Sequence, residues 1–184
     1  LNGSYQTGNA ALALAAAEQL SSLGFPVAPQ ALRQGLASAR WPGRMELISL
    51  PNGLELLLDG AHNPAGALAL AEALATYSTR TKILLLGMME DKDLQGVLQP
   101  LLQQVQQVIT VNPAQERAIP AAELAASCRA CGMPATAAES AAAGLASAQA
   151  AAKPGDLIIA AGSLFLVGEL KALLAGIPCE AVRG

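Results

Sequence analysis

Short, nearly continuous apolar runs recur along this chain, and alanine-rich segments with helical spacing separate them. The clearest runs are residues 82–86, 108–111 and 157–161. A strand that is apolar at successive positions is buried on both faces, as happens when helices cover both sides of a parallel sheet. The pattern therefore predicts a Rossmann-like α/β fold with a mostly parallel sheet and helices on both of its faces.

Other segments fit the same architecture. The turn Pro51-Asn52-Gly53 favours a β-hairpin at the start of the sheet, with strands at 45–50 and 54–58. Hydrophobic residues make up 53% of the chain but aromatic residues only 3%, which favours helices packed on a sheet over a β-sandwich. A further strand is expected at 134–138, and the helices of this region are expected at 64–77, 94–104, 121–130, 141–151 and 163–174.

Two more helices are expected before the sheet. Residues 9–23 are rich in Ala and Leu and end at Gly24, and residues 29–38 place two leucines four positions apart on one face. Neither helix belongs to the alternation of strands and helices that follows. We therefore divide the chain into residues 1–40, a helical segment, and residues 41–184, the α/β domain. Because the chain begins with Leu rather than Met, we expect further residues upstream.

Charge and composition disfavour several classes of function. The net charge is −3 and the sequence has no basic run, so a nucleic-acid partner is not expected. No apolar stretch reaches the roughly 18–20 residues of a membrane helix, and no secretory leader is recognisable, so a cytoplasmic protein is expected. Cys128 and Cys131 have CxxC spacing, but no second pair accompanies them and the single histidine, His62, is distant in sequence. We therefore expect reduced thiols and no metal site in this chain.

Polar side chains gather after the expected parallel strands. In open parallel sheets, ligands bind beyond the carboxyl ends of the strands. Those ends carry carboxylates, a histidine, a lysine and a hydroxyl in this sequence, within residues 59–63, 88–93, 112–113 and 162–163. One edge of the sheet is therefore predicted to form a binding crevice.

The segment after the hairpin is the richest of these. Asn63 suits the N-cap of the next helix, with Pro64 at its first position, so these two residues have a structural explanation. Asp59 and His62 are not needed for capping. A carboxylate at a strand end can accept hydrogen bonds from ribose hydroxyls, and a histidine beside a helix N-terminus can bind an anion. A solvated turn remains the alternative.

Three further residues are candidates for ligand contacts. Lys92 follows an apolar strand and is placed to pair with a ligand carboxylate, although the segment could also be a solvated loop in which Asp93 caps the next helix. Ser163 opens a helix after a glycine, where it could help to bind an anion or serve as a plain cap. Arg44 lies in the rigid turn Trp-Pro-Gly-Arg and suits phosphate recognition. Since neither GxxxxGK[ST] nor GxGxxG is present, we expect only half of a nucleotide site.

Taken together, these segments resemble the folylpolyglutamate synthase branch of the Mur ligase superfamily. The similarity covers nearly the whole chain, and its most specific part is the pairing of Trp-Pro-Gly-Arg with Asp-Gly-Ala-His-Asn-Pro about a dozen residues later. The matching motifs are Gln-Thr-Gly-Asn-Ala-Ala at 6–11, Arg-Trp-Pro-Gly-Arg at 40–44, Leu-Asp-Gly-Ala-His-Asn-Pro at 58–64, Met-Met-Glu-Asp-Lys-Asp at 88–93 and Ala-Gly-Ser-Leu-Phe-Leu-Val-Gly-Glu at 161–169.

The resemblance implies an ATP-dependent ligase that adds glutamate to folate through a γ-linked amide by way of an acyl phosphate. Whether the enzyme also synthesises dihydrofolate stays open. The same resemblance implies that Asn9, Arg44 and Asp59 contact ATP. It implies also that His62, the candidate catalytic residue, positions the incoming glutamate together with Lys92 and Ser163.

The resemblance further implies that ATP and Mg²⁺ are bound by a preceding domain, whose tail would be residues 1–40. The phosphate loop and the magnesium ligands would lie upstream, so this chain alone is expected to be inactive and to act with that domain, as a monomer, on ATP, glutamate and reduced folate. The alternatives are a cell-wall Mur ligase, a stand-alone nucleotide-binding module and a non-catalytic interaction domain. Cell-wall ligases usually carry a lysine near the position of His62, which favours the folate branch.

Overall fold

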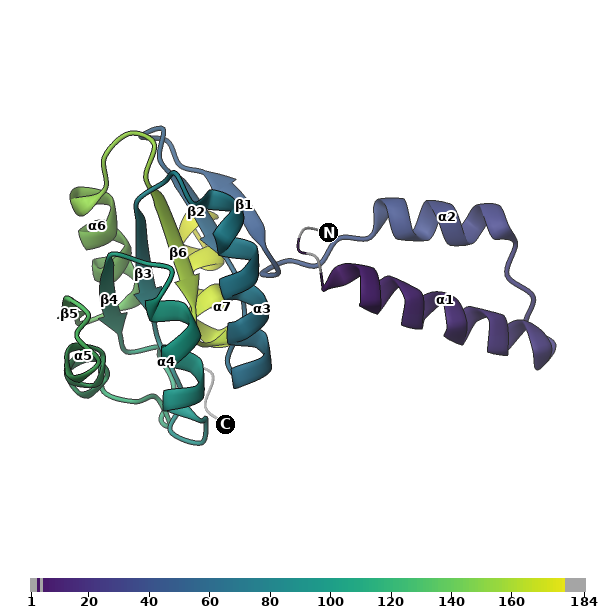
Figure 1. Ribbon diagram of the computed structural model, residues 1–184. Helices are drawn as coiled ribbons and strands as arrows, with labels where there is room; N and C mark the ends of the chain where they lie inside the picture. The colour runs from purple at the N-terminus through teal and green to yellow at the C-terminus, as the bar shows by residue number, and fades with distance from the viewer. Residues whose placement is uncertain (1–2, 4, 178–184) are drawn as a thin grey trace.

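Six strands form one sheet in the order β1-β2-β6-β3-β4-β5 in the computed structural model, which describes residue 3 and residues 5–177 (Figure 1). The first pair is antiparallel, and every other neighbouring pair is parallel. The strands are β1 (Glu46–Ser49), β2 (Glu55–Leu58), β3 (Lys82–Leu86), β4 (Gln107–Val111), β5 (Ala135–Ala138) and β6 (Leu157–Ala161). This confirms the mostly parallel sheet with an N-terminal hairpin.

Helices cover both faces of the sheet (Figure 1). One face packs against α3 (Pro64–Leu74), α4 (Leu94–Leu102) and α5 (Ala121–Ala130). The other packs against α6 (Ala141–Ala151) and α7 (Leu164–Leu174). Successive side chains of a strand point to opposite faces, so each buried strand contributes to both cores. In β6, for example, Leu157, Ile159 and Ala161 join the first core, and Ile158 and Ala160 join the second.

The predicted element boundaries agree closely with the structure. The expected helix at 64–77 ends as an α-helix at Leu74 and continues as the 3₁₀ turn η1 (Ala75–Tyr77). The helix expected at 94–104 ends two residues earlier, at Leu102. Side-chain caps explain four helix starts, because Asn63, Asp93, Ser140 and Ser163 each accept a hydrogen bond from a main-chain N–H of the following turn.

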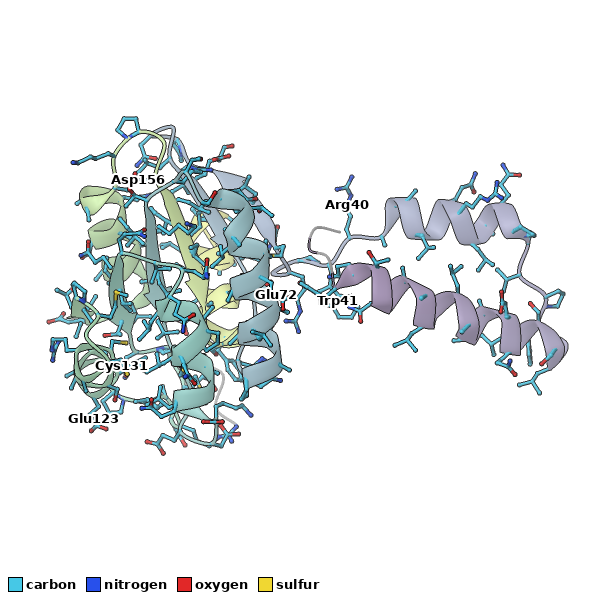
Figure 2. All side chains as sticks on the ribbon, in the orientation of Figure 1. Arg40, Trp41, Glu72, Glu123, Cys131 and Asp156 are labelled. Carbon is cyan, nitrogen blue, oxygen red and sulfur yellow. The ribbon has the colours of Figure 1, made fainter. Side chains whose placement is uncertain are left out.

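Two helices precede the sheet, as expected. They are α1 (Gln6–Ser22), which begins three residues before the predicted start, and α2 (Pro29–Ser38). They form a hairpin that projects from the α/β domain (Figures 1 and 2), and no residue of either helix is buried. Large apolar side chains such as Leu12, Leu23 and Phe25 are consequently exposed on the hairpin.

Tight approaches between segments shape the carboxyl edge of the sheet. Gly162, after β6, has φ 98°, and a Cβ atom there would lie 2.7 Å from the main-chain oxygen of Gly87, after β3. Its N–H donates to the oxygen of Ala61, 2.8 Å away. A glycine is required here because the backbone conformation and the close contact both exclude a side chain. The exits of β2, β3 and β6 are therefore held close together.

Within the described residues, the helices are too short or too polar to span a bilayer.

Candidate functional site

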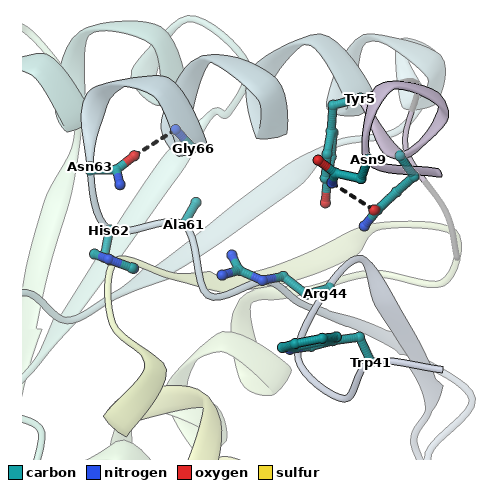
Figure 3. Close-up of a pocket in the computed structure, with 9 residues that line it drawn as sticks. Tyr5, Asn9, Trp41, Arg44, Ala61, His62, Asn63 and Gly66 are labelled. Atoms are coloured by element: carbon teal, nitrogen blue, oxygen red, sulfur yellow. Dashed lines mark hydrogen bonds between the residues drawn. The ribbon is translucent and has the colours of Figure 1, made fainter. Parts of the chain in front are cut away.

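A pocket of about 370 Å³ lies where the helical hairpin meets the carboxyl edge of the sheet (Figure 3). One wall comes from the start of α1, and the others come from the turn before β1 and the loop between β2 and α3. The residues that line it are Tyr5, Gln6, Asn9, Trp41, Arg44, Ala61, His62, Asn63 and Gly66.

Arg44 projects from a turn that is held from two sides. The N–H of Arg44 donates to the oxygen of Trp41 (3.2 Å), and the N–H of Gly43 donates to the carboxylate of Glu46 (2.6 Å). Lys171 on α7 donates to both oxygens of that carboxylate, at 2.5 and 2.8 Å. Burial by itself raises the pKa of Glu46, but the hydrogen bonds from Lys171 and Gly43 outweigh it and the net shift is downward. The turn that carries Arg44 is therefore anchored to the second core.

Asp59 joins this turn to the loop after β2. Its Oδ2 accepts from the N–H of Met45 (3.0 Å), and its Oδ1 accepts from the N–H of Ala61 (2.9 Å). The residue is only 3% exposed, and it lies behind the pocket rather than on its wall. Burial raises the pKa of Asp59, opposed by the two main-chain hydrogen bonds and by the nearby positive charge of Arg44. In this structure the carboxylate links two segments that line the pocket through hydrogen bonds to the main chain of each.

His62 and the start of α3 form the opposite wall. The Nδ1 atom of His62 lies 2.7 Å from the oxygen of Gly60 and must donate to it, because a carbonyl oxygen only accepts. In a neutral imidazole, Nε2 is then the nitrogen that can accept a proton. Asn63 caps α3 through the N–H of Gly66 (2.8 Å), which confirms its predicted role. The partial positive charge of the helix N-terminus thus faces the same pocket as Arg44, an arrangement that suits an anion.

Two of the predicted contacts lie elsewhere. Lys92 does not line the pocket; its Nζ donates to Asp91 (2.8 Å), and this hydrogen bond is the main reason why the pKa of Asp91 is lowered. Asp93 caps α4 through the N–H of Gly96 (3.0 Å), as the structural alternative predicted.

Ser163 is almost fully buried, and its Oγ accepts from the N–H of Phe165 (3.0 Å), so it caps α7. The structure therefore brings Asn9, Arg44 and His62 into one pocket with Asp59 directly behind them, and it leaves Lys92 and Ser163 outside that pocket.

Sequence reasoning missed the aromatic part of the site. Tyr5 packs against the core on the α3 side, and burial raises its pKa, with the negative charge of Asp59 adding to the effect. Trp41 is 66% exposed at the pocket. The Trp-Pro-Gly-Arg motif contained a signal for Trp41, since Pro-Gly favours a turn at the surface, where a tryptophan is unusual. Tyr5 has no comparable signal, because only the path of the hairpin brings it to the pocket.

Among the described residues, no three His, Cys, Asp or Glu side chains are grouped in a way that could hold a metal ion.

Three comparisons with known proteins bear on this site. Residues 43–164 match the family described as Mur ligase, glutamate ligase domain. A probable bifunctional folylpolyglutamate synthase/dihydropteroate synthase of Halobacterium salinarum is 37% identical over 175 residues, which are 93% of this chain and 20% of that protein.

Two solved structures share the fold over almost the whole chain. Mycobacterium tuberculosis folylpolyglutamate synthase complexed with ADP matches with a TM-score of 0.84 at 31% identity, over 97% of this chain and 42% of that chain. Escherichia coli FolC in complex with DHPP and ADP matches with a TM-score of 0.79 at 30% identity, over 91% of this chain and 39% of that chain.

This chain thus spans less than half the length of each of these relatives. The match to the family covers the turn of Arg44, the loop of Asp59 and His62, and all the parallel strands. The resemblance drawn from the sequence motifs is confirmed. The chain belongs to the Mur ligase family, as a glutamate ligase domain of the folylpolyglutamate synthase type.

Proposed function

We propose that this domain forms one side of the nucleotide and glutamate sites of an ATP-dependent ligase that extends folate with γ-linked glutamate. The observation that carries the proposal is the pocket in which Arg44, His62 and the N-terminus of α3 face Asn9 of the helical hairpin. Such a pocket offers fixed positive charge and hydrogen-bond donors to a polyphosphate. The ADP in the related Mycobacterium and Escherichia structures supports the same assignment.

In the proposed reaction, the terminal carboxylate of the folate attacks the γ-phosphorus of ATP, and ADP leaves. The amine of glutamate then attacks the acyl carbon, its nitrogen releases one proton to solvent, and phosphate leaves with the bonding electrons of the C–O bond as the amide forms. Catalysis of phosphoryl transfer depends mostly on positioning and charge stabilisation. Magnesium would neutralise phosphate charge, and its ligands would come from the domain that we propose precedes residue 41.

Each candidate residue has a role in this proposal. Arg44 and Asn9 contact the nucleotide, and Asp59 supports it by holding the Arg44 turn in place. His62 and Lys92 position the glutamate, and Ser163, which is buried outside the pocket, supports this edge of the sheet by capping α7. For Lys92 this requires release from Asp91, a step of small cost because both side chains are partly exposed and solvent screens such ion pairs.

The helical hairpin supports the proposed domain division. Its exposed leucines and Phe25 form an apolar surface that we propose packs against the rest of an ATP-binding domain, of which residues 1–40 are the tail. Closure of the two domains would complete the pocket and exclude water from it. A cell-wall ligase is less well supported, because the relatives that match more than nine-tenths of this chain are folate enzymes.

The test is steady-state kinetics in the polypeptide that joins this domain to its proposed ATP-binding domain. Arg44→Ala removes a charge-assisted contact to phosphate and should lower kcat/KM for ATP by about tenfold to a hundredfold. His62→Ala should chiefly raise the KM for glutamate. Arg117→Ala is the matched control, because that arginine is exposed and does not line the pocket. If Arg44→Ala behaved like Arg117→Ala with ATP, the nucleotide assignment would be wrong.

A further inference from the structure

Trp41 is placed unusually for so large an apolar side chain. It is the only tryptophan in a chain with very few aromatic residues, yet it is 66% exposed. It is the first residue of the anchored turn of Arg44, because the N–H of Arg44 donates to its carbonyl oxygen. An indole offers a large rigid surface whose burial is favourable, so a fixed and exposed one is typical of a binding platform.

The ring of Trp41 borders three hollows of the surface. It lines the pocket of Arg44 and His62, a second pocket of about 370 Å³ beside β1, and an apolar groove of about 600 Å³ along α1 and α2. Figure 3 shows the indole nearly edge-on, with Arg44 next to it and Tyr5 on the other side of Arg44. The space over the indole is therefore continuous with the part of the pocket that suits an anion.

The pocket combines charged and aromatic groups. Arg44 lies between the rings of Trp41 and Tyr5, and His62 and the start of α3 lie farther along the same pocket. A nucleotide offers a partner for each kind of group, with a charged phosphate chain at one end and a planar base at the other. Arg44 and Trp41 lie within one turn, so a ligand whose phosphates meet Arg44 has its base within reach of the indole.

We propose that Trp41 is the platform on which the base of the nucleotide stacks, and that it contributes to affinity through the base alone. This inference rests on the proposed function of the pocket. Stacking of a base on an aromatic side chain is worth enough to change a dissociation constant about fivefold to a hundredfold. It tolerates different bases because every base has a π-face, so selection among bases falls to hydrogen-bonding groups such as Asn9.

The single tryptophan makes the inference directly measurable in this chain. ADP should quench the fluorescence of Trp41 in a saturable way, whereas inorganic pyrophosphate, which has the charges but no base, should not. By calorimetry, Trp41→Leu should weaken ADP binding about fivefold to a hundredfold and leave pyrophosphate binding unchanged, and Trp41→Phe should retain part of the affinity. Arg44→Ala should weaken both ligands. Because Trp41 is exposed, thermal unfolding of Trp41→Leu should match the wild type.

The outcomes separate this inference from the proposed function. If Arg44→Ala weakens ADP while Trp41→Leu binds it like the wild type, the platform is refuted and the nucleotide pocket stands. If pyrophosphate quenches Trp41 as strongly as ADP does, the base is not on the indole. If a free pterin quenches Trp41 at concentrations where ADP does not, the indole stacks on a pterin ring and not on the base of the nucleotide. If ADP binds neither this chain nor the polypeptide that joins it to its proposed ATP-binding domain, the proposed function is refuted and the platform with it.

Discussion

Replacing Asp59 by alanine should destabilise the domain far more than the loss of an ordinary surface carboxylate. The carboxylate is almost fully buried and accepts from two main-chain N–H groups, those of Met45 and Ala61. A buried donor left without a partner costs about 1–3 kcal/mol, so the two together set an upper range of about 2–6 kcal/mol. Water entering from the adjacent pocket offsets part of this, and relief of the buried charge offsets more. We expect a loss of about 2–4 kcal/mol.

The assay is thermal and denaturant unfolding of the isolated chain. For a chain of this size, 2–4 kcal/mol corresponds to a fall in Tm of roughly 5–15 °C. Asp93→Ala is the matched control, since it removes an exposed carboxylate that accepts one hydrogen bond at a helix N-cap and should cost about 0.5–2 kcal/mol. If Asp59→Ala were no more destabilising than Asp93→Ala, the Asp59 carboxylate would not stabilise the domain by linking the two segments.

The pH dependence of Asp59 tests the same environment independently. Burial raises its pKa above the ordinary value of 3.8, so the folded state binds the proton more tightly than the unfolded chain does. Its protonation therefore contributes stability that is fully present below about pH 3.8 and is lost as the pH rises through the raised pKa. Asp59→Asn cannot ionise, so the stability of the wild type relative to this variant should fall with rising pH across that window. If the unfolding free energy of the wild type rose relative to that of Asp59→Asn as the pH increased, the upward shift of the Asp59 pKa would be contradicted.

Three further predictions concern other parts of the domain. Gly162→Ala should cost more than about 2 kcal/mol in denaturant unfolding, because the positive φ and a main-chain oxygen 2.7 Å from the added carbon allow no relaxation. Burial raises the pKa of Cys128 to about 11, so a maleimide should label exposed Cys131 in the native chain and Cys128 only after unfolding, as peptide mass mapping would show. The net downward pKa shift of Glu46 contributes stability that is present above pH 4.5 and lost as the pH falls through the lowered pKa. Glu46→Gln should reduce the loss of unfolding free energy at acid pH by no more than about 1 kcal/mol, since the pair with Lys171 is partly exposed.

The architecture was predictable because it depends on short-range pattern. Nearly every residue of β3 and β6 is apolar and buried, which only a sheet covered on both faces can satisfy. Helix starts were predictable from the side chains that cap them, as at Asn63 and Ser163. The insertion of β6 between β2 and β3 was not predictable in this way, because strand order depends on contacts between distant segments.

The candidate site was predictable only in part, for a related reason. Arg44 and His62 fall in motifs at the sheet edge, and the structure places both at one pocket. The sequence suggested Asp59 as a direct ligand contact, and it could not reveal that each of its oxygens accepts a main-chain N–H from a different segment of the site. Lys92 follows a strand as expected, but it does not line the pocket and pairs with the neighbouring carboxylate of Asp91. Proximity to a strand end thus predicts the neighbourhood of a side chain and leaves its partner undetermined.

The two halves of the proposed site differ in how firmly they are built. The turn of Arg44 is held by Asp59 on one side and by Glu46 with Lys171 on the other, so the main chain from which its guanidinium projects is fixed before any ligand arrives. Such preorganisation lowers the entropic cost of binding. Lys92, by contrast, is held only by a partly exposed ion pair that a ligand carboxylate can replace at little cost. A rigid cationic turn suits the polyphosphate, which has the same charge in every cycle, and an exchangeable lysine suits an amino acid that must enter and then remain in the product.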